Sequence, residues 1–374
     1  MDNKTFPVYL NLTAVALYGR AIGKVSPDDW LAASGWARQQ RTEGLLYEAA
    51  LLASPPDRPP RKLLLELYAY SLRLEQTNEM MSERIAELFD TYVHLGATPI
   101  LLKGHSVALN YPHPEWRTPG DIDVFLPEGF AATDVWARAN GTAVTGYDPQ
   151  TNKHVEFQWK GFCVENHFLL SIFYNRSLNR KLQAAFAEGM KAEPNSRACF
   201  AGRHVDLLPP TVGLLHLWVH FANHIVSEGI GLRQLCDIFM YLHKRHAEID
   251  ARLFNRWVDD LRLTRLTDAI TTVAVTYFHA PEEDFPYRWS ADPRRAKVLL
   301  QLVQASGNYG NGFSPHAIER RFHRLYKLRL LIQRSAKVNL LLPDELRAAW
   351  WGKTRNMMIF ALRALRKNTR RRTN

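Results

Sequence analysis

The pattern of hydrophobic and polar positions begins with two stretches of helical spacing. In "DDWLAASGWARQQRTEGLLYEAALLA" apolar side chains recur every three or four positions, and Ser26 stands where a helix N-cap is expected. A second long helix is predicted from about Arg61 to Leu95, with Gly96 at its end. Because "SPPDRPPRK" cannot continue a helix, it separates the two stretches.

The pattern then changes to short β-rich runs separated by Gly, Pro and Asn. The runs "ATPILLK", "DIDVFL", "HVEFQW" and "FCVENHFLL" predict a sheet between about residues 97 and 172. Helical spacing returns in "LLHLWVHFANHIV", "IGLRQLCDIFMYLHKRH" and "DARLFNRWVDDLRL". The chain is therefore expected to be an α+β protein, a small mixed β-sheet flanked by N- and C-terminal helical segments. The expected parts are residues 1–95, 96–200 and 201–374.

Composition narrows the class of protein. A chain of 374 residues with 46% hydrophobic residues has enough apolar material for a large core. Its three cysteines are widely spaced and form no CxxC pair, which favours a reducing cytoplasm over a disulfide framework. The N-terminal stretch lacks the features of a signal peptide, and the uncharged stretch 207–227 predicts a loop and a buried helix. No transmembrane segment is predicted.

The positive charge is concentrated at the C-terminal end. Residues 315–374 hold sixteen Lys or Arg against three acidic residues, which gives +13 in a chain whose total is +11. Within 350–374, tryptophans and an apolar run precede a cationic cluster. This tail suits an anionic membrane surface or a nucleic-acid backbone, so the cytoplasmic protein is a candidate for peripheral attachment to a membrane. The alternative is a last helix with a solvated end.

Two aspartates in "LLKGHSVALNYPHPEWRTPGDIDVFLP" carry the clearest chemical signal. On a strand, Asp121 and Asp123 point to one side while Ile122 and Val124 point into the core. Two neighbouring carboxylates repel each other and raise one pKa unless a cation lies between them. A divalent metal with oxygen ligands and open positions for phosphates would remove that cost.

The Lys-Gly pair that ends the preceding apolar run suits the same chemistry. Gly104 would let the backbone approach a phosphate closely, and Lys103 would add positive charge if it turned toward the site. Asp-x-Asp alone is a weak motif, so its meaning depends on the surrounding order of elements.

That order resembles the nucleotidyltransferase superfamily related to DNA polymerase beta. More closely, "ILLKGHSVALNYPHPEWRTPGDIDVFLP" resembles the bacterial "uncharacterised nucleotidyltransferase" family, whose pattern runs Leu-Lys-Gly, Tyr-Pro, then Arg and Asp-x-Asp. The segments "WARQQRTEGLLYEA", "VENHF" and "GIGLRQLCDIFMYL" resemble further parts of that family. The resemblance covers roughly residues 25 to 245 and implies a nucleotidyltransferase core at 96–200.

The resemblance implies a metal-dependent transfer of a nucleoside monophosphate from an NTP to an acceptor hydroxyl. Asp121, Asp123 and Glu165 would be the catalytic residues and the ligands of Mg²⁺ or Mn²⁺, and Glu165 would help to deprotonate the acceptor. Glu156, on the preceding strand, is the alternative third acid. ATP is the expected donor, while the sequence does not name the acceptor.

The same resemblance implies that Lys103, Gly104, Ser106 and Arg117 bind the nucleotide. Arg117 would hold a phosphate or orient Asp121, or else form a structural ion pair. The chain departs from the superfamily at His105, where a small residue usually follows the glycine. Either His105 points away and Ser106 serves instead, or the turn binds nucleotide poorly.

Three histidines, His216, His220 and His224, recur on one predicted helix face. A zinc stripe is one interpretation, but no HExxH pattern accompanies it, and a core helix with hydrogen-bonded histidines is simpler. His220 or His224 is also a candidate to face the substrate near Asp237. Trp116 is expected to anchor a loop, with stacking on a nucleobase as its alternative.

Two other classes of function remain open. One is a catalytically inactive nucleotidyltransferase-fold binding protein, which the unusual residue at 105 favours. The other is a protein that associates with nucleic acid or a membrane surface through its basic C-terminus.

Overall fold

The first helical part forms as the apolar spacing predicts. The computed structural model describes residues 5–145, 152–227, 229–306, 323–352 and 354. Ser26 and Asp29 form a capping box at the start of the second helix, which confirms Ser26 as its N-cap. The N-terminal elements are α1 (Phe6–Tyr18), α2 (Pro27–Gln40), α3 (Glu43–Leu52), the 3-10 turn η1 (Pro55–Asp57) and α4 (Arg61–His94).

A mixed sheet of seven strands follows, in the order β3-β4-β5-β2-β1-β7-β6. Strand β2 runs parallel to β5 and antiparallel to β1, while β1 runs parallel to β7. The strands are β1 (Ile100–Leu101), β2 (Ile122–Phe125), β3 (Thr142–Thr145), β4 (His154–Trp159), β5 (Phe162–His167), β6 (Ser196–Phe200) and β7 (Arg203–Leu207). Between them lie α5 (His105–Ala108), η2 (Pro114–Trp116), α6 (Phe130–Asn140) and α7 (Arg176–Ala192). The α+β prediction is thus confirmed.

The sheet is larger than the sequence pattern predicts. The prediction that it ends near residue 172 is wrong, because β6 and β7 form a further hairpin whose β7 pairs with β1. This hairpin carries Arg197, Arg203 and His204 on exposed positions, so it lacks the apolar run that marks a buried strand. Its turn, Ala201-Gly202, has positive φ at both residues, the conformation of a two-residue hairpin loop.

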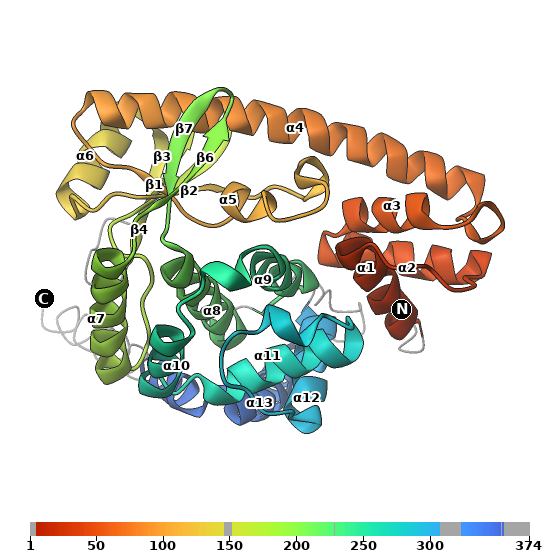
Figure 1. Cartoon of the computed structure of the whole chain (residues 1–374). Helices are drawn as coiled ribbons and strands as arrows, with labels where there is room; N and C mark the ends of the chain where they lie inside the picture. Colours follow the sequence, from red (N-terminus) through yellow and green to blue (C-terminus); the bar gives the residue numbers. More distant parts are fainter. Residues whose placement is uncertain (1–4, 146–151, 228, 307–322, 353, 355–374) are drawn as a thin grey trace, which may run out of the picture.

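The two faces of the sheet pack against different helices. On one face, Leu101, Ile122 and Val124 belong to a buried cluster with residues of α4 and α6. Figure 1 shows α4 lying along the sheet and continuing to α1–α3 at its other end. At 34 residues, α4 is roughly 50 Å long. Strand alternation turns the polar residues of β2 and β5 to the opposite face, toward the C-terminal helices.

The C-terminal helices form the second and larger cluster. They are α8 (Pro210–Ser227), α9 (Leu232–Arg245), η3 (His246–Glu248), α10 (Ala251–Asp260), α11 (Thr264–Tyr277), η4 (Glu282–Asp284), α12 (Pro293–Ser306) and α13 (His323–Leu341). Their buried residues share one cluster with α1–α3, and Gln40 links the parts by accepting from Leu232 N at 2.7 Å and donating to Val303 O at 3.2 Å. The division at residues 95 and 200 stays a prediction.

Within the uncharged stretch at 207–227, the predicted buried helix is α8, while Leu207 is the last residue of β7 and was not predicted to lie in a strand. Among the described residues, no helix is both long and apolar enough to cross a membrane. Most of the basic tail at 350–374 lies outside the described residues, and Trp351 within it is 73% exposed.

Candidate active site

The three predicted acidic residues meet on the polar face of the sheet. Asp121 directly precedes β2, Asp123 lies within β2, and Glu165 lies on the neighbouring parallel strand β5. The register pairs Asp123 with Glu165, because Ile122 and Val124 fix the other face of β2 in the core. Asp123 is only 2% exposed. The fold therefore brings Glu165 to two aspartates that precede it by more than forty positions in the sequence.

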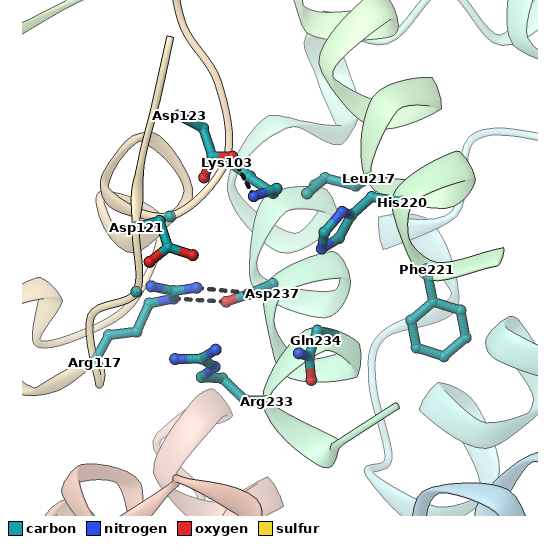
Figure 2. A pocket seen from close by; sticks show the side chains of 12 residues that line it. Lys103, Arg117, Asp121, Asp123, Leu217, His220, Phe221, Arg233, Gln234 and Asp237 are labelled. Atoms are coloured by element: carbon teal, nitrogen blue, oxygen red, sulfur yellow. Dashed lines mark hydrogen bonds and ion pairs between the residues drawn. The ribbon is translucent and has the colours of Figure 1, made fainter. Parts of the chain in front are cut away.

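Lys103 supplies positive charge to this group from the end of β1. Its ammonium forms an ion pair with Asp123 and lies 4.0 Å from Glu165 Oε2. Figure 2 shows Lys103 reaching toward Asp123 while the Asp121 carboxylate faces the pocket below them. The sequence left open whether Lys103 turns toward the site, and this contact with Asp123 shows that it does.

Two histidines complete the cluster. His167 is fully buried, and its Nε2 lies 3.1 Å from both Asp123 Oδ1 and Glu165 Oε2. His154 of β4 places Nδ1 3.2 Å from the same Glu165 oxygen. Glu156, the alternative third acid, lies opposite Glu165 in the β4–β5 register and lines the neighbouring cavity.

The pKa values of Glu165 and Asp121 are shifted in opposite directions. Burial alone would raise the pKa of Glu165, but Lys103 and a hydrogen bond from His167 hold that pKa well below its usual range. The pKa of Asp121 is raised by desolvation and by repulsion from Asp123 and Glu165, which the lysine only partly offsets. Glu165 is consequently ionised at neutral pH, whereas a further cation would stabilise the ionised form of Asp121.

The turn after β1 depends on Gly104. Its φ of +77° and ψ of −109° are accessible to glycine but strained for other residues, and its backbone lines the pocket drawn in Figure 2. His105 is buried, and burial lowers its pKa to about 4. The Ser106 hydroxyl donates to the Leu102 carbonyl within the same turn. The roles of Gly104 and Ser106 in nucleotide binding stay predictions.

Arg117 forms the ion pair that the sequence left as one of its alternatives. Its Nε and Nη2 donate to the Asp237 carboxylate at 2.7 and 2.8 Å, and Tyr111 donates to the same group at 2.7 Å. Asn78 of α4 donates to the Arg117 carbonyl at 3.0 Å. Arg117 also lines the pocket beside Asp121, so its contribution to phosphate binding stays a prediction.

Two cavities adjoin the carboxylates and share Lys103, Asp121 and His220. The smaller, of about 40 Å³, reaches Gly104, Arg117, Arg233 and Asp237. The larger, of about 510 Å³, extends past Glu165 and His154 to Tyr174 and His224. Its volume lies within the range of small-molecule sites.

The histidine-bearing helix α8 forms one wall of both cavities. His220 and His224 line the larger cavity, and Figure 2 shows His220 pointing from α8 toward the space between Lys103 and Asp121. Burial lowers the pKa of both imidazoles, to about 4 for His224. Within the described part of the chain, the zinc interpretation gains no support, since the cluster with metal-ligand spacing is His154, Glu165 and His167. Facing the substrate stays the prediction for His220 and His224.

Trp116 anchors its loop. Its indole donates to Glu75 Oε1 at 2.6 Å and stacks on the His113 ring at 4.0 Å between centroids, while Tyr47 packs against its edge. This arrangement confirms loop anchoring.

Sequence reasoning assigned no role to the two histidines of the cluster. The sequence "WKGF" could have indicated that these histidines lie together. A two-residue Lys160-Gly161 turn fixes His154 opposite His167 and Glu156 opposite Glu165. Arg233, which donates to the Thr118 carbonyl at 2.9 Å in the same pocket, carried no comparable signal in the sequence.

Fold and site together define a nucleotidyltransferase-like α+β protein. The chain belongs to the family described as "Uncharacterised nucleotidyltransferase", which matches residues 26–279 and so includes every residue of the cluster. The resemblance drawn from the sequence is confirmed.

A crystal structure of an antigenic nucleotidyltransferase-like protein from Paracoccidioides brasiliensis is similar over 55% of this chain and 92% of that one, with 11% identity and a TM-score of 0.30. A search of curated proteins found no match.

Proposed function

We propose that the protein is a metal-dependent nucleotidyltransferase that moves a nucleoside monophosphate from an NTP to an acceptor hydroxyl. The observation that carries the proposal is the convergence of Asp121, Asp123 and Glu165 on one sheet face, beside the Lys103-Gly104 turn. Family membership supports the same class of reaction.

The side chains present fit a divalent ion. Asp121, Asp123 and Glu165 offer the carboxylate oxygens that Mg²⁺ and Mn²⁺ prefer. The pKa of Asp121 is raised by burial and also by repulsion from Asp123 and Glu165, and a second positive charge beside Lys103 would relieve that repulsion. When bound, the ion would neutralise triphosphate charge and favour loss of the hydroxyl proton.

The remaining residues would position the reactants. Glu165, ionised at neutral pH, would accept the proton of the acceptor hydroxyl. Lys103 and the backbone at Gly104 would contact the phosphates, with Ser106 supporting the turn. Arg117, held by Asp237, would present a fixed positive charge at the pocket wall.

The cavity beside the carboxylates would hold the donor and the acceptor. ATP is the expected donor, and the cavity of about 510 Å³ has room for a nucleotide. His220 and His224 would contact one of the two substrates there. We retain the cytoplasm as the expected compartment and residues 350–374 as the candidate contact with an anionic membrane or nucleic acid.

Thermal unfolding with each of the four NTPs, with and without Mg²⁺ or Mn²⁺, tests the proposal. Stabilisation should require nucleotide and metal together and should disappear in Asp121→Asn/Asp123→Asn. Because this variant also removes the ion pair of Asp123 with Lys103, its folding is checked by circular dichroism. Glu165→Gln should keep nucleotide binding and lose pyrophosphate release. If Glu156→Gln lost turnover instead, the two glutamates would exchange roles. A double Asp variant that still bound Mg·NTP normally would rule out the metal assignment.

One observation favours a second candidate, a catalytically inactive binding protein. Lys103 already pairs with Asp123, and a lysine that neutralises this carboxylate permanently would leave a nucleotide site without metal. Nucleotide binding that is unchanged by chelator, with no pyrophosphate release, would establish this candidate over the enzyme.

A further inference from the structure

The ligand-type side chains on β4 and β5 form a second feature of the site, distinct from the aspartate pair. His154, Glu165 and His167 each place one nitrogen or oxygen within 4.8 Å of those of the other two residues. They meet because β4 and β5 pair with His154 directly opposite His167, in a register set by the Lys160-Gly161 turn. The arrangement therefore follows from the hairpin itself.

The spacing of these atoms matches a coordination shell. The distance from Glu165 Oε2 is 3.1 Å to His167 Nε2 and 3.2 Å to His154 Nδ1, and His167 Nε2 lies 3.1 Å from Asp123 Oδ1. Ligands about 2.1 Å from one metal ion are separated by about 3.0 Å at right angles and about 3.4 Å in a tetrahedron. The observed separations lie between these values.

The surroundings also favour a bound cation. His154 Nδ1 is buried and makes no hydrogen bond within the described residues, although the Glu165 oxygen lies 3.2 Å away. The cluster opens to the cavity of about 510 Å³, through which an ion and its water ligands can enter. Lys103 contacts the same oxygens of Asp123 and Glu165, so an incoming ion would share them with the ammonium.

We propose that His154, Glu165 and His167, adjoined by Asp123, bind a divalent transition-metal ion. Two imidazoles with one or two carboxylates suit Zn²⁺, Co²⁺ or Fe²⁺, whereas Mg²⁺ prefers oxygen alone. This inference goes beyond the proposed function, because ion binding here requires neither nucleotide nor turnover. In a nucleotidyltransferase, Asp123 and Glu165 would be candidate ligands both of this ion and of an ion held by Asp121.

Cobalt titration of the chelator-treated full chain tests the site without nucleotide. One equivalent of Co²⁺ should give saturable visible absorption bands, and Zn²⁺ should displace it while a large excess of Mg²⁺ should not. His154→Gln and His167→Gln should each weaken cobalt binding by at least about tenfold. The same substitution at His204, exposed on β7 and outside the cluster, gives the matched control.

A further variant separates this inference from the proposed function. Asp121→Asn should retain cobalt binding within about threefold while losing Mg·NTP binding, since Asp121 belongs only to the aspartate pair. Absence of a saturable cobalt spectrum, or wild-type spectra from both histidine variants, would overturn the inference whatever the nucleotide results. His154 lies nearer the cavity than the fully buried His167. If His167→Gln does not fold, cobalt binding by His154→Gln therefore tests the inference alone.

Discussion

The guanidinium of Arg117 and the carboxylate of Asp237 form a buried ion pair through two contacts of 2.7 and 2.8 Å, which joins the loop before β2 to helix α9. Burial would raise the pKa of Asp237, but Arg117 lowers it below its ordinary value. Together with the hydrogen bond from Arg233 of α9 to the Thr118 carbonyl, this pair holds the loop before the aspartates against α9.

Removing one member of this pair should destabilise the protein strongly. Asp237→Asn leaves the Arg117 charge buried without its partner, so the free energy of unfolding should fall by about 3 to 5 kcal/mol. Denaturant unfolding measures the change. Arg256→Met, which breaks an exposed pair with Glu188, should cost less than about 1 kcal/mol. Equal stability of Asp237→Asn and the wild type would contradict the structural role.

Gly104→Ala should strain the turn without creating a clash. An added Cβ would lie 3.5 Å from the Asp121 carbonyl, an ordinary contact, but φ at this position is +77°. The variant should lose about 1 to 3 kcal/mol of stability and bind Mg·NTP more weakly. Gly23→Ala, where the backbone is unstrained and the space is open, is the control for thermal unfolding and for nucleotide titration. Wild-type values from Gly104→Ala would show that the turn tolerates a side chain.

His105 should make the protein less stable in acid. Burial, with Arg117 nearby, lowers its pKa to about 4, whereas the unfolded chain titrates near 6.5. Between these values the unfolded state binds a proton that the folded state does not, so stability falls as the pH decreases through that range. His105→Gln should therefore lose less thermal stability than the wild type between about pH 7 and about pH 5. The same substitution at the exposed His204 is the comparison, and identical pH profiles for His105→Gln and wild type would contradict the assignment.

Lys103→Met should change metal and nucleotide binding in opposite directions. Removing the ammonium leaves Asp123 and Glu165 without their nearest cation, so Mn²⁺ alone should bind more tightly. Nucleotide affinity should fall by roughly tenfold, because a charged contact to phosphate is lost. Calorimetry with Mn²⁺ and then with Mg·NTP measures both, with Lys181→Met on the exposed face of α7 as control. A parallel decrease in both affinities would show that Lys103 mainly maintains the fold.

The sequence contained enough to place the aspartate pair but less to place its neighbours. Strand parity and the apolar residues Ile122 and Val124 predicted that Asp121 and Asp123 share a face, and in the structure both aspartates line the same cavity. The pairing of Asp123 with Glu165 could not be derived from either strand alone, because a register between distant parallel strands depends on the packing of the whole sheet.

Contacts between distant segments were harder still to predict from the sequence. Arg117 and Asp237 lie 120 positions apart, and both residues had several plausible roles until α9 was placed beside the loop. The hairpin β6–β7 was missed for a different reason, since its charged and exposed residues hide the alternation that marks a strand.

The contact between Lys103 and Asp123 also bears on how the chain reaches its folded state. Adjacent acidic strands would resist association if only an external ion could neutralise them. The ammonium at the end of β1 arrives with the strand that pairs with β2, so the sheet carries its own counter-charge during assembly. Because this counter-charge belongs to the chain itself, the folded sheet does not need a bound ion to neutralise Asp123.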